Sequence, residues 1–516
     1  MHRNTRIVAL ITCLVAVHAA QAEVKLPAIF GSNMVIQRDR EIPVWGWADA
    51  GEAVTVEFAG QTKETQADAK GTWRVALDAV KVGKPLILRV TGRNTIELSN
   101  ILVGDVWLCS GQSNMAWTVR RSDHADREIT SATQPRIRLI TVPRETADAP
   151  QGDFKGKWEE CSPQTIGEFS AVGYFFGREL EKHVNVPIGL INSSYGGTPA
   201  DAWTSRAALE AAQDFKPLLA EWDRRVTEIT AAKVQEQNQA ALEKWKAAVD
   251  KAKAAGQEPP ARPRPQRAPA DDPNRPASLY NAMIAPIAPF AIRGTIWYQG
   301  ESNCPRAAQY RTLFPAMIAD WREVFGQKEM PFLFVQLAPF RYTRNPKEWC
   351  AELWEAQLMT LANVPHTGMA VTTDLGDVKD IHPTNKQEVG RRLALWARAT
   401  VYGEKDLAFS GPIFAGHAAI GDAIRIRFHH EKGLKSRDGK PLTHFTIAGK
   451  DHVFHRAEAT IHEGSITVKS DKVKEPVAVR FAWEDDAEPN LVNGAELPAS
   501  PFRTDDLPLT TAARKF

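Results

Sequence analysis

The sequence predicts an α/β protein with a parallel β-sheet covered by helices on both faces and with β-rich regions toward both ends of the chain. Between residues 103 and 402, apolar strand-like runs alternate with amphipathic helix-like runs. Before and after this stretch, short runs alternate apolar and polar residues and are separated by Gly, Asp, Asn and Pro. The length of 516 residues is enough for more than one domain.

Residues 1–22 have the pattern of a secretory signal peptide. Arg3 and Arg6 give a positive start, residues 7–17 are apolar, and residues 20–22 form an A-x-A-like cleavage site. The apolar run is too short for a retained membrane span, and Glu23 follows the expected cut where a lipid anchor would need cysteine. We therefore expect an exported protein, periplasmic or extracellular, without a membrane anchor.

The composition excludes several classes of partner. Without Arg3 and Arg6, Lys+Arg equals Asp+Glu at 62 each, so we expect no basic surface for nucleic acid. No CxxC pair and no Cys/His cluster has zinc-site spacing, so we expect no metal and no cofactor. The mature chain keeps Cys109, Cys161, Cys304 and Cys350. An even number of thiols permits disulfides, but their pairing and the oligomeric state stay open.

The pattern divides the mature chain into successive regions. Residues 23–100 form the predicted N-terminal β-domain, and residues 101–204 and 277–402 form the α/β domain. The interruption at 205–276 is first rich in Ala, Lys, Glu and Gln with heptad-like apolar spacing, which predicts helix, and then proline-rich, which predicts a surface segment. Residues 403–516 are β-rich. We expect the two β-rich regions to lie together beside the α/β domain.

The stretch "DVWLCSGQSNMAW" contains the candidate nucleophile, Ser113. An apolar strand precedes the turn through Gly111, and a helix-like run follows it. Ser113 should therefore lie at the carboxyl edge of the sheet near a helix N-terminus, where free N–H groups favour negative charge. This place suits a nucleophile whose reaction develops an oxyanion, although a simple helix N-cap is the alternative. The G-x-S-x-x pattern argues against an ordinary α/β-hydrolase.

A serine nucleophile needs a base, and His382 is the candidate. It follows the strand-like "MAVTTDL" and precedes a helix-like run, so it should lie on a loop at the same edge of the sheet. Asp380 stands two residues earlier, and in an extended segment both side chains point the same way. Asp380 would then orient the imidazole. Asp374 and Asp377 are competing candidates for this role.

Two further strand ends supply candidate oxyanion-hole donors. "NSSYGGTPADAW" contains Gly197, and "IWYQGESN" contains Gln299, Glu301 and Asn303. An acyl-transfer oxyanion hole needs backbone N–H groups and, often, a side-chain amide. The N–H groups of Ser113 and Gly197 and an amide of Gln299 or Asn303 would provide these. Glu301 is interpreted as a structural hydrogen-bonding partner rather than a base.

Taken together, "GQSNM", "NSSYGGTPADAW", "LYNAMIAPI", "WYQGESN" and "DIHPTNKQEVGRRLA" resemble the signature blocks of the sialate O-acetylesterase family of the SGNH hydrolase superfamily. The resemblance covers nearly the whole mature chain except 205–276. It implies a three-layer α/β/α, flavodoxin-like SGNH core with β-sandwich-like accessory regions. It also implies Ser113 as nucleophile, His382 as base, and Gly197 with an amide of "YQGESN" at the oxyanion hole.

One departure leaves the third triad member open. The superfamily usually spaces its acid and base as D-x-x-H, whereas this chain has D-x-H. Asp380 is our choice, and a backbone carbonyl or another carboxylate is the alternative.

The predicted function is that of a serine esterase that releases acetate from O-acetylated carbohydrates, either sialic acids or sugars from plant polysaccharides. A noncatalytic carbohydrate-binding protein and an esterase for non-carbohydrate esters are the alternatives. Trp117, Trp203 and Tyr298 lie beside the motifs and either pack on a sugar ring or belong to the core. The sequence does not identify the sugar, the acetylated position, or a preference for polymer over oligosaccharide.

Overall fold

The computed structural model describes residues 23–343 and 345–514, so the predicted signal peptide lies outside the described residues. The N-terminal β-region contains β1 (Val35–Gln37), β2 (Ile42–Trp47), β3 (Ala53–Phe58), β4 (Gln61–Gln66), β5 (Thr72–Leu77), β6 (Leu86–Thr91) and the first part of β7 (Thr95–Gly111). Strands β3, β4, β6 and β7 pair antiparallel, as do β2 and β5. Exposed and buried residues alternate along β5, as expected for strands that bury one face.

The central sheet has the strand order β13-β12-β11-β7-β10-β8-β9. Its further strands are β8 (Gln134–Thr141), β9 (Glu159–Cys161), β10 (Ile188–Ser194), β11 (Gly294–Tyr298), β12 (Phe332–Val335) and β13 (Thr367–Ala370). All neighbours pair parallel except β9, which runs antiparallel to β8. The chain adds β8 and β10 on one side of β7 and then crosses to add β11 on the other. Ligands of such sheets bind beyond the strand ends at this switch point.

Strand β7 runs without a break from the N-terminal β-region into the central sheet. It spans residues 95 to 111 and therefore crosses the predicted division at residue 100. Its first six residues alternate between exposed and partly exposed, whereas residues 101–111 are all buried. The change marks the point where helices begin to cover both faces of the sheet.

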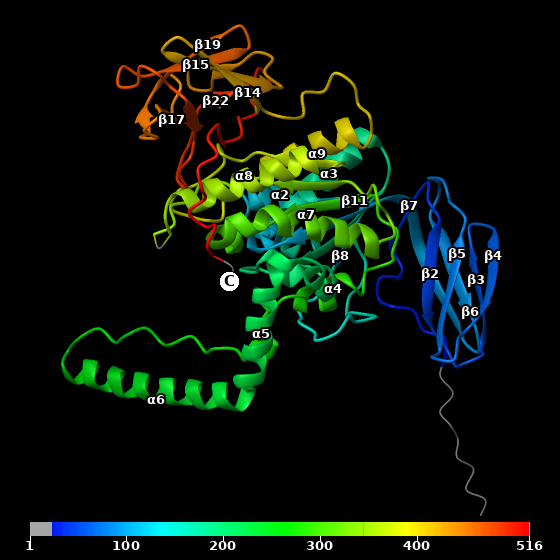
Figure 1. Cartoon of the computed structure of the whole chain (residues 1–516). Helices are drawn as coiled ribbons and strands as arrows, with labels where there is room; N and C mark the ends of the chain where they lie inside the picture. Colours follow the sequence, from blue (N-terminus) through cyan, green and yellow to red (C-terminus); the bar gives the residue numbers. More distant parts are fainter. Residues whose placement is uncertain (1–22, 344, 515–516) are drawn as a thin grey trace, which may run out of the picture.

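Helices cover the two faces of the central sheet, which confirms the predicted α/β fold with accessory β-regions. The α-helices of the described chain are α1 (Ser113–Ala116), α2 (Ala125–Thr130), α3 (Ala171–Val184), α4 (Arg206–Ala211), α5 (Lys216–Glu228), α6 (Ala231–Ala254), α7 (Ala307–Val324), α8 (Glu348–Asn363) and α9 (Lys386–Thr400), of which α6 lies outside the core. Figure 1 shows α3 beside α9, and the two helices pack against each other.

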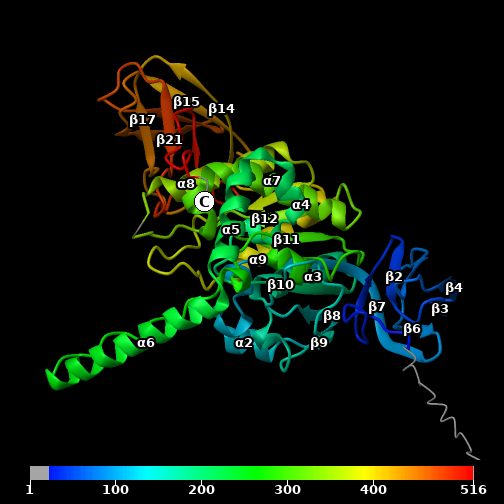
Figure 2. The same cartoon turned by 60° about the horizontal axis from the view of Figure 1, so that its bottom comes forward.

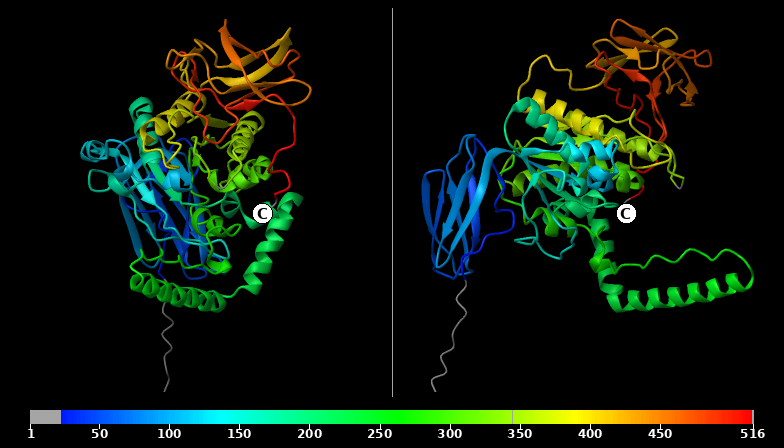
Figure 3. Two further views of the ribbon diagram at one scale, coloured as in Figure 1. Left: turned by 90° about the vertical axis from the view of Figure 1, so that its left-hand side faces the viewer. Right: turned by 180° about the vertical axis from the view of Figure 1, so that it is seen from behind.

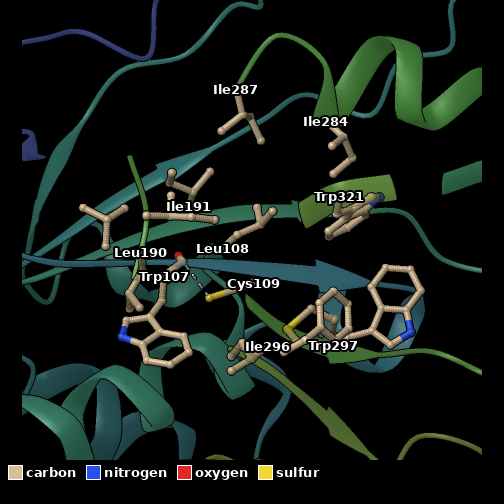
Figure 4. Packing of buried hydrophobic residues seen from close by; sticks show 14 of the residues in the cluster. Trp107, Leu108, Cys109, Leu190, Ile191, Ile284, Ile287, Ile296, Trp297 and Trp321 are labelled. Carbon is tan, nitrogen blue, oxygen red and sulfur yellow. Dashed lines mark hydrogen bonds between the residues drawn. The ribbon is translucent and has the colours of Figure 1, made fainter. Parts of the chain in front are cut away.

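Successive residues of the central strands point to opposite faces of the sheet, and helices cover the side chains on both faces. Trp107 of β7 meets Phe176 of α3, with ring centroids 4.9 Å apart. Trp297 of β11, whose neighbour on β7 is Ser110, meets Trp321 of α7 at 5.6 Å. Figure 4 shows the same division among further labelled residues, with Leu108, Ile191, Ile284 and Ile287 on one side and Trp107, Cys109 and Ile296 on the other.

Helix α6 and the proline-rich segment that follows it form a projecting arm. Helix α6 extends away from the body of the molecule (Figure 2), and the proline-rich segment runs back along it (Figure 1). Only Val234 and Ala252 of α6 are buried. The returning segment is held by Trp245, whose indole N–H donates to the carbonyl of Pro260 at 2.8 Å. The arm therefore makes most of its contacts with itself.

The C-terminal region is a separate set of antiparallel sheets. It contains β14 (Ile413–Ile420), β15 (Ala423–His429), β16 (Lys435–Ser436), β17 (Phe445–Ala448), β18 (His455–Arg456), β19 (Glu458–His462), β20 (Ser465–Lys469), β21 (Ala478–Phe481), β22 (Leu491–Val492) and β23 (Phe502–Arg503). Figures 1 and 3 show it on a different side of the core from the N-terminal β-region, so the expectation that the two lie together is wrong. It packs instead near α8, where Arg503 pairs with Glu355.

The state of the cysteines and the character of the helices bear on disulfides and membrane spans. All four described cysteines are free and buried. In residues 23–343 and 345–514, none of the helices combines the length and the apolar character needed to cross a membrane.

Candidate active site

Three neighbouring strands, β7, β10 and β11, end side by side at the carboxyl edge of the sheet, and the candidate site lies at this edge. Gly111 of β7 is in register with Ser194 of β10 and with Tyr298 of β11. Gly111 has φ +137°, and a Cβ at this position would lie 2.2 Å from the carbonyl oxygen of Tyr298. Glycine is therefore required where the chain turns out of β7 toward Ser113.

Ser113 begins α1, which is a single turn rather than a longer helix and ends at Ala116. Its side chain is partly exposed, whereas Asn114 and Met115 behind it are buried. Gly196 lies against it, because a Cβ on Gly196 would be 3.2 Å from the Cβ of Ser113. The predicted nucleophile thus stands at the carboxyl edge of the sheet, beside the glycines that follow β10.

The loop that carries His382 lies next to Ser113. The side-chain amide of Asn114 donates to the carbonyl oxygen of Ile381 at 3.0 Å, so the residue after Ser113 contacts the residue before His382. The indole of Trp117 stacks on the imidazole of His382, with centroids 4.9 Å apart and planes inclined by 19°. Within the described part of the chain, no hydrogen bond joins the Ser113 hydroxyl to His382 directly.

His382 is in a state suited to a base. Partial burial and, next, the nearby ammonium of Lys386 lower its pKa below the usual value of about 6.5, while Asp380 acts in the opposite direction. The imidazole is therefore neutral at neutral pH. Asp380 lies close, with its Oδ1 3.6 Å from Nδ1 of His382, but this oxygen accepts the backbone N–H of His382 at 2.9 Å. The Asp380 side chain is 58% exposed.

The two competing aspartates are occupied elsewhere. Asp374 forms a two-pronged ion pair with Arg392, at 2.6 and 2.7 Å, that ties the loop to α9. Asp377 accepts the backbone N–H of Lys379 at 2.8 Å. Asp380 is therefore the carboxylate of this loop that has an oxygen near the imidazole.

Three N–H donors without partners lie in the segments that follow β7, β10 and β11. In the residues that the structure describes, the backbone N–H groups of Ser113 and Gly197 donate no hydrogen bond. Gly197 has φ +76°, and nothing lies within 4 Å of the position of a Cβ. Nδ2 of Asn303 is buried and has no partner either. An unsatisfied buried donor is costly, so Nδ2 of Asn303 is available to a ligand oxygen.

The structure separates the roles of the two candidate amides. Nε2 of Gln299 donates to Asn303 Oδ1 at 2.6 Å and to the carbonyl of Thr198 at 3.2 Å. Its Oε1 accepts from the hydroxyl of Tyr310 at 3.0 Å. Gln299 is fully engaged and fixes the orientation of Asn303, whose Oδ1 also accepts from the N–H of Ala200. Asn303, rather than Gln299, has the free N–H.

Glu301 belongs to a buried polar network that the sequence reasoning did not identify. One carboxylate oxygen accepts from Nδ2 of Asn114 at 2.6 Å, and the other is buried without a partner. Burial raises the pKa of Glu301. Lys386 donates to Oδ1 of Asn114 at 2.5 Å. Gln112 joins the same loops, because its Oε1 accepts the N–H of Gly300 at 3.3 Å.

Gln112, Asn114 and Lys386 lie inside the sequence blocks that mark the site. Their position in these blocks is the only feature of the sequence that indicates a role for them. The neighbouring aromatic residues prove to be structural. Trp203 and Tyr298 are fully buried, and Trp117 lies between the site and Arg121, whose guanidinium is 3.6 Å from the indole centroid. Among the described side chains, no three of His, Cys, Asp and Glu gather as a metal site would require.

Comparisons with known proteins point to one family. Residues 103–251 and 270–398 match the profile described as "Carbohydrate esterase, sialic acid-specific acetylesterase". The sialate O-acetylesterase of Rattus norvegicus is 34% identical over 453 residues, covering 79% of each chain. That of Homo sapiens is 31% identical over 533 residues, covering 93% of this chain and 92% of the human one. The crystal structure of a carbohydrate acetylesterase from Xanthomonas citri matches with a TM-score of 0.80 and 38% identity, over 94% of this chain and 100% of that one.

Proposed function

This chain belongs to the carbohydrate esterases described as sialic acid-specific acetylesterases, and we propose that Ser113 and His382 perform its chemistry. The chain is a carboxylic ester hydrolase that acts on O-acetyl groups of carbohydrates. The observation that carries the assignment of the site is the buried, unpartnered N–H of Asn303, whose Oδ1 accepts the N–H of Ala200 in the segment that follows Gly197.

In the acylation step, His382 removes the proton of the Ser113 hydroxyl as the oxygen attacks the acetyl carbonyl carbon. The carbonyl π electrons move to its oxygen, which becomes the oxyanion of a tetrahedral intermediate. When the intermediate collapses, the bond to the sugar oxygen breaks, and the imidazolium of His382 gives its proton to that oxygen. The sugar alcohol leaves, and the acetyl group stays on Ser113.

Deacylation repeats these events with water. Neutral His382 removes a proton from water, and the hydroxide oxygen attacks the acetyl-serine carbonyl. Collapse returns the proton to Ser113 and releases acetate. The lowered pKa of His382 supports this role, because the imidazole must be neutral at the start of each half-reaction.

The oxyanion is held by the N–H groups of Ser113 and Gly197 and by Nδ2 of Asn303. These donors come from the ends of β7 and β10 and from the segment after β11, so the sheet fixes their spacing before substrate binds. Preorganised donors of this kind are worth about 10²–10³ in kcat each. Asp380 orients His382 through its side chain, and its exposure makes it a weaker partner than a buried triad acid.

The substrate class is an O-acetylated sugar, and two sources are supported by the relatives' names. The mammalian relatives are sialate O-acetylesterases, and the bacterial structural relative is a carbohydrate acetylesterase. We therefore propose O-acetylated sialic acids or O-acetylated sugars of plant polysaccharides. The pattern of residues 1–22 supports export, which would bring the enzyme to such substrates outside the cytoplasm.

Acetate release from matched substrates tests the proposal. Wild type and Ser113→Ala are incubated with O-acetylated sialic acids, acetylated xylan, acetylated xyloglucan oligosaccharides and short non-carbohydrate acetate esters. We expect wild type to release acetate from at least one carbohydrate with a higher kcat/KM than from the simple esters, and Ser113→Ala to release none above background. Equal preference for simple esters, or release by Ser113→Ala, would contradict the proposed function.

A further inference from the structure

Lys386 is a buried cation at an unfavourable position. It is the first residue of α9 and has no exposed surface. An ammonium at a helix N-terminus opposes the helix dipole, and its burial costs solvation. Burial accordingly lowers its pKa to about 7. The partners that hold this amino group therefore indicate the role of Lys386.

The contacts of the ammonium define that role. Nζ is 2.5 Å from Oδ1 of Asn114 and lies 5.2 Å from the ring centroid of Tyr298 and 5.8 Å from that of Trp117. A lysine ammonium only donates hydrogen bonds, so it fixes which end of the Asn114 amide faces it. Nδ2 must then point the other way, toward Glu301 and the carbonyl of Ile381.

The oriented amide joins the three loops of the site. Nδ2 of Asn114 donates to Oε1 of Glu301 at 2.6 Å and to the carbonyl of Ile381 at 3.0 Å. Asn114 follows the nucleophile, Ile381 precedes the base, and Glu301 stands two residues before Asn303. One side chain therefore connects the segments that carry Ser113, His382 and the amide donor.

We propose that Lys386 is a positioning residue that acts through Asn114 to hold Ser113 and His382 in reactive register. The inference rests on the proposed function and adds to it a pair of residues that do not touch the substrate. The buried carboxylate of Glu301 balances the charge of Lys386 across the same amide. Without the ammonium, the Asn114 amide would be free to rotate, and the link between the two loops would weaken.

The test compares Lys386→Met and Asn114→Asp with wild type in p-nitrophenyl acetate hydrolysis. Methionine keeps the length of the side chain and removes the donor. Aspartate keeps the acceptor for Lys386 and replaces the Nδ2 donor with an oxygen that repels Glu301. Because a misplacement of about 1 Å can cost about 100-fold in rate, we expect kcat to fall by about that factor in each variant. KM should stay within about twofold of wild type.

Two further readouts separate positioning from general damage. The double variant Lys386→Met/Asn114→Asp should lose no more than the more impaired of the two single variants, because both changes break one linkage. The acid limb of kcat/KM should move to higher pH in Lys386→Met, because the ammonium lowers the pKa of His382. The other charged groups that act on His382, Arg121 and Asp380, remain in place. A general loss of structure would lower kcat/KM by the same factor at every pH and would leave the acid limb at the same pH.

Lys379→Met is the matched control, since Lys379 is exposed on the same loop as His382 and should keep wild-type kcat. Wild-type kcat and an unmoved acid limb in Lys386→Met, or losses that multiply in the double variant, would overturn the proposal. If Lys386→Met does not fold, the kcat of Asn114→Asp decides the question alone. Failure of the proposed function looks different, because Ser113→Ala would then equal wild type.

Discussion

At the scale of single residues, the site depends on atoms left without partners. Gln299 uses all of its hydrogen-bonding groups, and it aims Asn303 so that one buried N–H stays free. The sequence could indicate that an amide of this block acts, but it could not separate the two. The distinction depends on a contact with Tyr310 from the following helix.

Asn303→Asp tests the assignment of the free N–H. Aspartate keeps the shape of the side chain but replaces the donor with an oxygen, so kcat for acetyl esters should fall about 10²–10³-fold. Ser302→Ala is the control, because the Ser302 side chain has no hydrogen bond in the described structure and its loss should change kcat little. A near-wild-type kcat in Asn303→Asp would remove Asn303 from the oxyanion hole.

The pH dependence tests the state of His382. Because its pKa is lowered, kcat/KM of wild type should hold down to a pH below about 6.5 and fall as the imidazole protonates. Asp380 raises this pKa, so Asp380→Asn should move the acid limb to lower pH. The rate loss should be well below the roughly 10⁴-fold that a buried triad aspartate contributes, because Asp380 is 58% exposed. A 10⁴-fold loss would show that Asp380 closes on His382 when substrate binds.

At the scale of elements, both the apolar runs and the alternating runs predict strands that the structure contains, and the differences lie where one element changes its pattern. Strand β10 begins with the apolar run "IGLI" and is buried at every residue, as expected of a strand that is covered on both faces. The sequence pattern predicts a division within β7, at residue 100, because the first part of this strand alternates and the second part is apolar. Helix α1 ends after one turn, and Trp117, the residue that follows, stacks on His382. That contact joins residues far apart in the chain.

The arm that contains α6 should be dispensable for chemistry. Its returning segment is tied to α6 by Asn238, whose Nδ2 donates to the carbonyl of Gln266 at 2.9 Å, and Ala231 and Arg267 line the same groove. Replacing residues 231–266 with a short Gly/Ser linker should leave the turnover of p-nitrophenyl acetate within about twofold and the melting temperature nearly unchanged. Differential scanning calorimetry and initial rates provide the check. Loss of turnover on the small ester would assign the arm to the catalytic machinery.

At the scale of the whole molecule, one sheet unites segments from the entire chain. Three strand ends and one loop carry residues 113, 197, 303 and 382 of the proposed site, and the order of these strands around β7 follows from the crossover between β10 and β11. The parallel α/β pattern allowed these four to be predicted together, because the carboxyl ends of parallel strands share an edge. The network behind them was not predictable, because the bond from Lys386 to Asn114 spans 272 residues.

The most direct test of the account is the kinetics of Ser113→Ala, His382→Ala and the double variant on one acetyl ester. Residues that act as a unit do not contribute additively. We therefore expect each single variant to lose roughly 10⁴-fold or more in kcat, and the double variant to lose no more than either alone. Substantial activity in either single variant, or losses that multiply in the double variant, would contradict it.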